Sequence, residues 1–242
     1  MKHLLSVILL LSLVLTVSAQ VKFDVRAGVG TGSLTGGMSN TDCLVSYKLG
    51  AGVDLPIGKS RVFAVEPGLF FSAKGMAYKG FFRSDDMMEN ANYTTRLTYL
   101  EIPVCMVAKL RLGSRCGIIF KAGPYLAYGL NGKTTVKVQY TDFKYTFPQN
   151  HFNSACDYSG MAYDEDNHKL QSPKFNRVDA GITEGIDFRI NHFLIGMEAA
   201  FGLTPVCNDA YMGNGFGNAL YGLFYGSKPK NVTVNITAGY RF

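Results

Sequence analysis

The C-terminal stretch NVTVNITAGYRF, residues 231–242, decides the fold. Every second residue from Val232 to Phe242 is apolar or aromatic, and the residues between them are polar, glycine or basic. An alternation with a period of two is typical of a β-strand that keeps one face away from water. In a soluble sandwich the apolar face points into a core, whereas in a membrane barrel it points towards lipid. The alternation alone does not separate these two architectures.

The same alternation runs through seven further segments, which brings the number of expected strands to eight. These segments are residues 22–32, 47–55, 62–73, 96–111, 116–130, 177–188 and 193–203. The links between successive strands alternate in length. The odd-numbered links (33–45, 74–93, 131–175 and 204–230) are long, and the even-numbered links (57–61, 113–115 and 189–192) are short. A strict long-short alternation is typical of outer-membrane barrels, and a Greek-key sandwich has no reason to produce it. We therefore predict an all-β fold: an eight-stranded antiparallel up-and-down transmembrane β-barrel with short periplasmic turns and long extracellular loops.

The N-terminus has the layout of an export signal. Lys2 and His3 precede an apolar run from Leu4 to Val17, and the small-residue triplet 17–19 follows. The run is shorter than the ~20 residues that a spanning helix needs. We predict a cleavable signal peptide at residues 1–19 and an outer-membrane β-barrel domain at residues 20–242.

Composition narrows the function classes. The 242 residues are 47% hydrophobic and 17% charged, which excludes a disordered chain. The net charge of +6 could suggest a nucleic-acid partner, but no run of five like charges occurs. We expect no nucleic-acid binding.

The polar face of the expected strands carries balanced charge. Its basic residues are Lys22, Arg26, Lys48, Lys109, Arg111, Lys121 and Arg241, and its acidic residues are Asp24, Asp54, Glu66, Glu101, Asp179, Asp187 and Glu198. An eight-stranded barrel is only wide enough for side chains to fill its interior, so these lumen charges must pair with one another. The sequence therefore predicts a plugged scaffold and not a pore.

Glu184 breaks the alternation, because it falls on the apolar face of segment 177–188. A charge that faces mid-bilayer lipid costs about 2 kcal/mol or more. We expect either a β-bulge at Glu184 or a position near the membrane edge.

Four short motifs carry a family resemblance. They are the run from Tyr99 to Val104 that precedes Lys109, the run from Lys121 to Leu126, the triplet 179–181, and the ending 238–242. In these motifs, and over essentially the whole mature chain, the sequence resembles the PorT-type family of outer-membrane β-barrel proteins found in Bacteroidota. The resemblance implies an eight-stranded outer-membrane barrel without shared catalytic residues. One group of that family is linked to a gliding and protein-secretion apparatus, and no feature places this chain in that group.

The last residues also resemble a sorting signal. A terminal Phe242 with Tyr240 two residues before it is similar to the signal read by the barrel-insertion machinery, which acts by strand addition to an open sheet edge. The alternative is that these residues simply complete a good final strand.

The five cysteines form an odd set in an oxidising compartment. Cys105 and Cys116 lie seven residues out of register across their expected hairpin, or roughly 23 Å apart, too far for a disulfide. Cys156 and Cys207 could tie loops three and four together. The alternative is free thiols.

Other candidate chemistry is weak. The acidic run 164–168 lacks the spacing of a calcium loop, so we expect a solvated loop tip and neither metal nor cofactor. His151, Ser154 and Asp157 supply the residue types of a catalytic triad, but chance clustering in a polar loop is favoured. The glycine-rich run 28–32 lacks a following Lys-Ser/Thr and enters no helix, so it indicates a bend in a barrel strand.

The sequence thus favours a non-enzymatic outer-membrane barrel that anchors and presents its loops, particularly loop three, to an extracellular ligand or an envelope protein. Its further partners are outer-membrane lipid and, during assembly, the barrel-insertion machinery. Two alternatives stay open: a subunit of a secretion- or gliding-type envelope assembly, and a loop-based outer-membrane hydrolase.

Overall fold

Eight long strands form the body of the protein. The computed structural model describes residues 21–35, 41–58, 60–84, 87–138, 144–146, 150–154, 156–157, 171–172, 174–207 and 228–242. The long strands are β1 (Lys22–Thr35), β3 (Leu44–Ile57), β4 (Phe63–Ser84), β5 (Met87–Arg111), β6 (Cys116–Val138), β10 (Val178–Ile190), β11 (Phe193–Gly202) and β12 (Lys230–Arg241). Four short strands, β2 (Thr41–Asp42), β7 (Lys144–Thr146), β8 (Cys156–Asp157) and β9 (Gln171–Ser172), complete the set.

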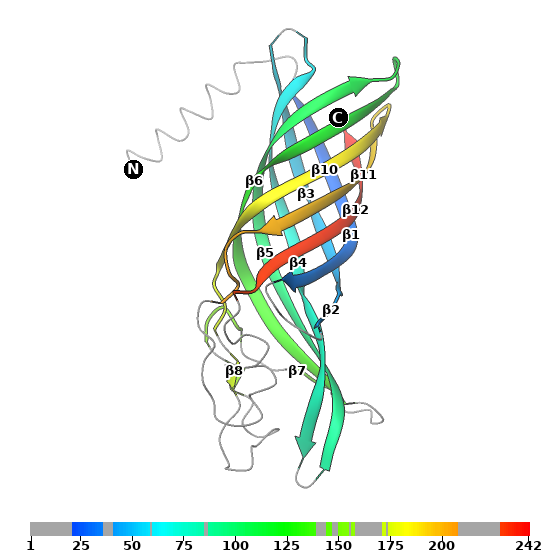
Figure 1. Cartoon of the computed structure of the whole chain (residues 1–242). Helices are drawn as coiled ribbons and strands as arrows, with labels where there is room; N and C mark the ends of the chain where they lie inside the picture. The colour runs from blue at the N-terminus through cyan, green and yellow to red at the C-terminus, as the bar shows by residue number, and fades with distance from the viewer. Residues whose placement is uncertain are drawn as a thin grey trace, which may run out of the picture.

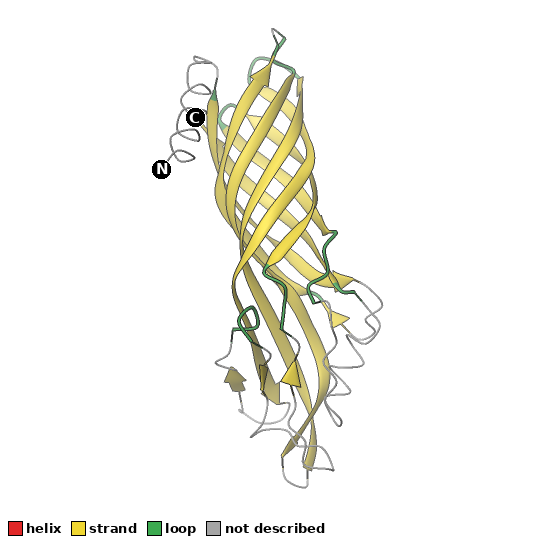
Figure 2. Ribbon diagram, turned by 90° about the vertical axis from the view of Figure 1, so that its left-hand side faces the viewer, coloured by secondary structure: helices red, strands yellow, loops and turns green. Residues whose placement is uncertain are grey.

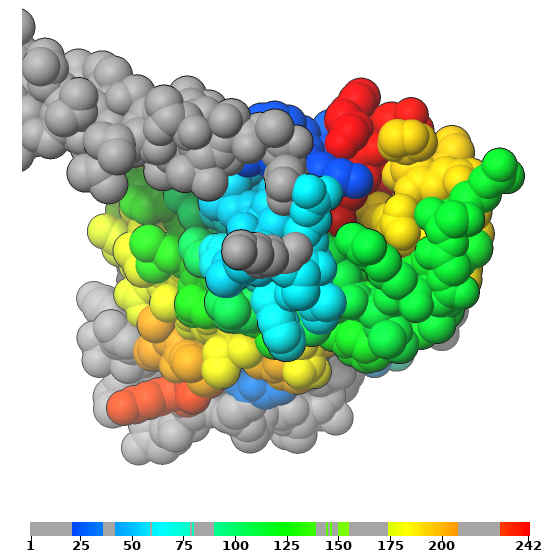
Figure 3. Space-filling model, turned by 90° about the horizontal axis from the view of Figure 1, so that it is seen from above, coloured from blue at the N-terminus to red at the C-terminus, as the bar shows by residue number. Residues whose placement is uncertain are grey.

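The long strands close into a ring. Each pairs antiparallel with the next long strand along the chain, and β6 pairs with β10. The last strand, β12, pairs with β1 from Asp24↔Arg241 to Thr35↔Lys230, so the first and last strands of the barrel lie side by side (Figures 1 and 3). The prediction of an eight-stranded antiparallel up-and-down barrel is confirmed.

The two ends of the barrel differ. Short turns join β3 to β4, β5 to β6 and β10 to β11 at one end, which is uppermost in Figure 1. At the other end β4, β5 and β6 continue well past the remaining strands (Figures 1 and 2). The predicted long loop at residues 74–93 is therefore wrong, because β4 and β5 pair without interruption from Gly75↔Arg96 to Ser84↔Met87. Beyond lipid neither face of a strand has to be apolar, so the sequence loses its alternation there.

The barrel is apolar on the outside. Outward side chains on every strand are exposed, for example Val29 at 59%, Met197 at 57% and Ile236 at 66%. Exposed aromatic residues form two belts. The belt towards the short turns contains Phe63, Phe188, Phe193 and Tyr240, and the belt towards the long loops contains Phe71, Tyr128 and Phe201. This pattern, with charges inside and apolar side chains outside, fits a lipid environment and excludes a soluble sandwich.

Within the part of the chain described above, no helix has the length and hydrophobicity required to cross a bilayer. The predicted signal peptide, residues 1–19, lies outside the described residues and stays a prediction.

Glycine permits close strand contact in β1. A Cβ added at Gly30 would lie 1.9 Å from the carbonyl oxygen of Val234 on β12, far inside van der Waals contact. Gly30 therefore lies where the backbone of β12 leaves no room for a side chain on β1, at the pairing that closes the ring.

Candidate functional site

The charged interior begins near the short turns, with Arg241 on β12. Its guanidinium lies 2.7 Å from Asp24, 2.9 Å from Asp54 and 2.8 Å from Glu66. Lys109 on β5 reaches the other oxygen of Asp54 at 2.6 Å. The last strand thus supplies the cation that joins carboxylates of β1, β3 and β4.

Arg26 on β1 continues the network inward. Its guanidinium lies 2.7 Å from Asp24, 2.7 Å from Glu66 and 3.3 Å from Asp187. Since the Arg26 side chain is only 4% exposed, the charge depends on these carboxylates and not on water.

The central part of the network joins lysines to glutamates. Lys121 lies 3.6 Å from Asp187 and 2.9 Å from Glu198. Glu198 also binds Lys48, whose ammonium group is 2.7 Å from Glu101 and 4.6 Å from the centre of the Phe70 ring.

Lys74 ends the network on the side of the long loops. Its ammonium group lies 2.8 Å from Glu101, 3.0 Å from Asp179 and 4.2 Å from the ring centre of Tyr125. The hydroxyl of Tyr125 and the side-chain amide of Asn231 both donate hydrogen bonds to Asp179.

These contacts form one continuous network in which every link joins a basic to an acidic residue, and we call it the ion-pair ladder. It contains Lys109, Asp54, Arg241, Asp24, Glu66, Arg26, Asp187, Lys121, Glu198, Lys48, Glu101, Lys74 and Asp179. All of them are buried except Lys109, which is half-buried. The ladder follows the barrel axis and contains residues from all eight long strands.

The six lumen charges singled out from the sequence (Glu66, Glu101, Lys109, Lys121, Asp179 and Glu198) are all members of the ladder. Lys74 is a further member, in a segment that the sequence predicts to be a loop. Conversely, Lys22 and Arg111 are exposed at the end with the short turns. Side chains of β4 point alternately inward and outward, and Lys74 is at an inward position like Glu66 and Ser72. Continuing this alternation to residue 74 would have identified Lys74.

An apolar plug lies at the end with the long loops. Phe152 is fully buried, packs edge-to-face on Tyr99 with ring centres 5.4 Å apart, and approaches Gly129, where an added Cβ would lie 2.5 Å from its ring. Met76, Leu97 and Val206 belong to the same buried cluster. Phe152, from a segment that the sequence assigns to loop three, therefore packs against side chains of the long strands.

His151 fixes this plug to β6. Its backbone N–H donates to the carbonyl of Gly132 at 2.9 Å, its Nε2 lies 2.7 Å from the Thr134 hydroxyl, and its ring stacks on Phe175. Burial of the imidazole lowers the pKa of His151 to about 4, because the charged form loses its hydration.

This pKa predicts that the plug loosens in acid. When the segment is undocked, His151 has an ordinary pKa near 6.5, so the undocked form binds more protons between pH 6.5 and 4. Docking is fully stable above pH 6.5 and weakens by up to about 3 kcal/mol as the pH falls to 4. Amide exchange at residues 150–153, corrected for the intrinsic pH dependence, measures it. The effect disappears in His151→Gln, and an effect that persists there contradicts the assignment.

The structure describes the side chains of two residues of the candidate triad, His151 and Ser154. His151 is buried in the plug, whereas Ser154 is exposed three residues further on. The side chain of Asp157 and the acidic run 164–168 lie outside the described residues. Among the residues that are described, no group of three or more His, Cys, Asp or Glu side chains is arranged to hold a metal ion.

The cysteines give a partial result. Cys43 is an exposed thiol, Cys105 a buried thiol, and Cys116 a partly buried thiol. Cys207 is buried in the cluster around Phe152, but the side chain of Cys156 lies outside the described residues. The disulfide between Cys156 and Cys207 stays a prediction.

The aromatic ending lies on the outer surface at the end with the short turns. Tyr240 stacks on His192 and packs edge-to-face on Phe193 and Phe242, with ring centres 5.0–5.5 Å apart. The backbone N–H of Phe242 donates to the carbonyl of Phe23. The ending is thus fully paired in the finished barrel, and its part in sorting stays a prediction.

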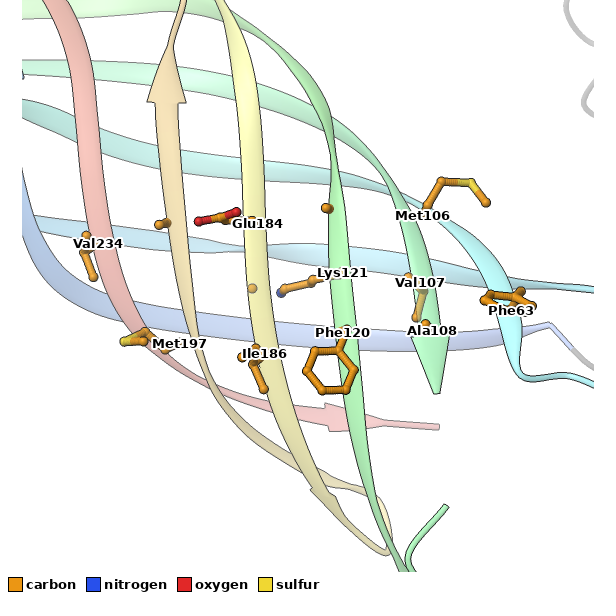
Figure 4. Close-up of a pocket in the computed structure, with 13 residues that line it drawn as sticks. Phe63, Met106, Val107, Ala108, Phe120, Lys121, Glu184, Ile186, Met197 and Val234 are labelled. Carbon is orange, nitrogen blue, oxygen red and sulfur yellow. The ribbon is translucent and has the colours of Figure 1, made fainter. Parts of the chain in front are cut away.

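Glu184 lies in an apolar groove on the outer wall (Figure 4). Its strand keeps a continuous register, with Ala199 on one side and Ala122 on the other, so the expected bulge is wrong. It also lies midway between Val178 and Ile190, so the expected position near the membrane edge is wrong too. The neighbouring alanines leave a groove of about 720 Å³, with walls that include Phe120, Ile186 and Met197.

We expect Glu184→Leu to raise the free energy of unfolding in lipid vesicles by about 1–2 kcal/mol, because it removes a carboxylate from the bilayer midplane. Lys121 is the other ionisable residue on the groove, and its ammonium group binds Glu198 in the interior. Urea titration measures the change, and Glu184→Gln separates charge from size. A loss of stability in both variants would contradict an unpartnered carboxylate.

A closed ring of eight strands with a lipid-facing apolar surface and a charged interior defines an outer-membrane β-barrel protein. A family model described as "Outer membrane protein beta-barrel domain" matches residues 18–208. The chain belongs to this family and is located in the outer membrane. The short turns are therefore periplasmic and the long-loop end is extracellular.

Two solved structures resemble the chain at low identity. Ail, the attachment invasion locus protein of Yersinia pestis, crystallised with the heparin analogue sucrose octasulfate, is 11% identical with a TM-score of 0.38, over 93% of this chain and 100% of that chain. The translocator domain of the autotransporter NalP from Neisseria meningitidis is 9% identical with a TM-score of 0.34, over 93% of this chain and 89% of that chain. No curated protein matches the chain.

Proposed function

We propose that this protein is a closed, non-enzymatic scaffold that anchors extracellular loops in the outer membrane and presents them to a ligand or an envelope partner. The ion-pair ladder carries this proposal. It fills the membrane-spanning interior with paired side chains, and Phe152 and its neighbours cover the extracellular end. A barrel of eight strands has no width to spare for a channel beside them.

The first test is electrical. In planar bilayers the purified barrel gives no steady open conductance, since ion flow would require the separation of several buried ion pairs. The double variant Glu101→Ala/Lys74→Ala removes one link of the ladder. Its current record shows what sporadic leakage through a weakened interior looks like, for comparison with the wild type. Steady unitary steps from the wild-type protein would overturn the closed scaffold.

The presentation of loops is supported by the extended strands. Residues 75–84 and 87–96 continue the β4–β5 hairpin beyond the ladder, and β6 follows them to Val138. A rigid platform of this kind holds the attached loops away from the membrane. Affinity capture from intact outer membrane tests whether an envelope protein or an extracellular ligand is retained.

A subunit role in a secretion- or gliding-type assembly is the second candidate. Co-purification with a larger complex would favour it, and a monodisperse monomer in mild detergent would count against it. A loop-based hydrolase has less support, because His151 packs in the plug while Ser154 is exposed. If the protein is not an enzyme, a preparation of Ser154→Ala shows the same background hydrolysis as the wild type.

The narrower PorT-type membership, and with it a source in Bacteroidota, is also a proposal. Its most specific motif, residues 99–104, has a physical role here. Tyr99 packs against Phe152, and Glu101 binds Lys48 and Lys74. A motif that forms both the plug contact and the ladder is one that a family of closed barrels would share.

A further inference from the structure

A polar pocket opens at the periplasmic mouth of the barrel, the end that faces the viewer in Figure 3. Its volume is about 350 Å³. It is lined from the ends of several strands, with six basic residues and a single acidic one: Lys22, Arg61, Lys109, Arg111, Arg189, Arg241 and Asp54. The excess of positive charge distinguishes this mouth from the ladder as a whole, which has six basic and seven acidic members.

The one carboxylate of the pocket is already occupied. Asp54 binds Lys109 through one oxygen at 2.6 Å and Arg241 through the other at 2.9 Å. Among the described residues, none of the remaining four basic side chains forms an ion pair. Arg189 donates only a hydrogen bond to the carbonyl of Asn191.

The alternation of side chains along each strand turns these cations towards the inside of the periplasmic mouth. Lys22, Arg111 and Arg189 are at inward-facing positions of β1, β5 and β10. Each lies at or next to the periplasmic end of its strand. Inside the bilayer the same parity carries residues of the ladder, such as Asp24 and Asp187. Grouped like charges repel one another, so an anion bound between them would lower the free energy of the mouth.

Arg61 adds a conformational observation. It lies in the turn between β3 and β4 with φ of 55°, in the left-handed region that side chains other than glycine, asparagine and aspartate rarely adopt. Residues held in such a conformation cluster at ligand sites.

We propose that the periplasmic mouth is a binding site for a phosphate group that carries at least one negative charge. Arginine guanidinium groups match phosphate oxygens with paired hydrogen bonds, and three of the four uncommitted cations are arginines. Leu110 and Ile118 line the same pocket, so a phosphate attached to an acyl chain is accommodated as well as a soluble one. The phosphate is supplied either by an anionic phospholipid of the periplasmic leaflet or by a soluble polyphosphate.

The test compares two double variants with the same change of charge. Arg111→Gln/Arg189→Gln removes two cations from the pocket but touches no member of the ladder, and Lys133→Gln/Lys137→Gln removes two exposed cations at the extracellular end. Heat-modifiable migration on gels verifies that each variant is folded. Arg111→Lys/Arg189→Lys keeps the charge if the glutamine variant fails to fold.

Two arms separate the sources of phosphate. Calorimetry in neutral detergent measures binding of pyrophosphate, and native mass spectrometry of nanodiscs counts phosphatidylglycerol molecules that stay bound, against phosphatidylcholine. In at least one arm the wild type and the extracellular control bind equally, and Arg111→Gln/Arg189→Gln binds at least tenfold more weakly. Binding of neither probe, or equal weakening by both glutamine variants, overturns the proposal.

Discussion

Replacement of Arg26 by methionine lowers the free energy of unfolding by about 3–5 kcal/mol. Arg26 lies within 4 Å of three carboxylates at once, namely Asp24, Glu66 and Asp187. Methionine retains the bulk of the side chain but leaves Asp187 dependent on Lys121 at 3.6 Å. A buried carboxylate that loses its partner carries its full desolvation cost.

Urea titration of the protein refolded in lipid vesicles measures this loss. Arg115→Met, the same substitution in the exposed turn between β5 and β6, is the matched control and changes stability by less than about 0.5 kcal/mol. A loss below about 1 kcal/mol for Arg26→Met would mean that water hydrates the interior carboxylates, and the closed scaffold would then be wrong as well.

Replacement of Gly30 by alanine prevents the ring from closing in its present register. The added Cβ would lie 1.9 Å from the carbonyl oxygen of Val234 and 2.6 Å from the Cα of Asn235, both backbone atoms of β12. Backbone cannot swing aside as a flexible side chain does, so the cost lies at or above the upper end of overpacking, about 3 kcal/mol.

Folding yield in vesicles and outer-membrane yield in cells both measure this effect. Gly113→Ala serves as the control, because a Cβ at Gly113, in the turn between β5 and β6, meets nothing within 4 Å. Equal yields from the two alanine variants would show that β1 and β12 approach each other less closely than described here.

The membrane-spanning part of the fold could be predicted from the sequence, because lipid imposes a strict rule. Each spanning strand must show an apolar side chain at every second position, and the segments around Ile102, Ile186 and Ile236 obey it. The same parity assigned Glu101, Lys121 and Glu198 to the interior. Their individual partners could not be predicted, because register and barrel shear determine which strands face one another.

Features outside the membrane escaped prediction for the opposite reason. Neither the β4–β5 extension nor the docking of Phe152 is constrained by lipid, so no periodicity marks them. Phe152 is recognisable only once Gly129 and Tyr99 are known to leave space for its ring. Glu184 is at an outward-facing position of its strand, where an apolar residue is expected. The alanines at positions 122 and 199 that lie beside it belong to the neighbouring strands, so the sequence of β10 alone does not reveal them.

The position of Arg241 links completion of the chain to completion of the structure. Asp24 and Asp54 lie near the start of the sequence, yet a cation they share is the penultimate residue, 217 residues after Asp24. A nascent barrel that lacks its final strand would carry these carboxylates without that counter-charge. Pairing of β12 with β1 therefore closes the sheet and supplies the last cation of the ladder in one step.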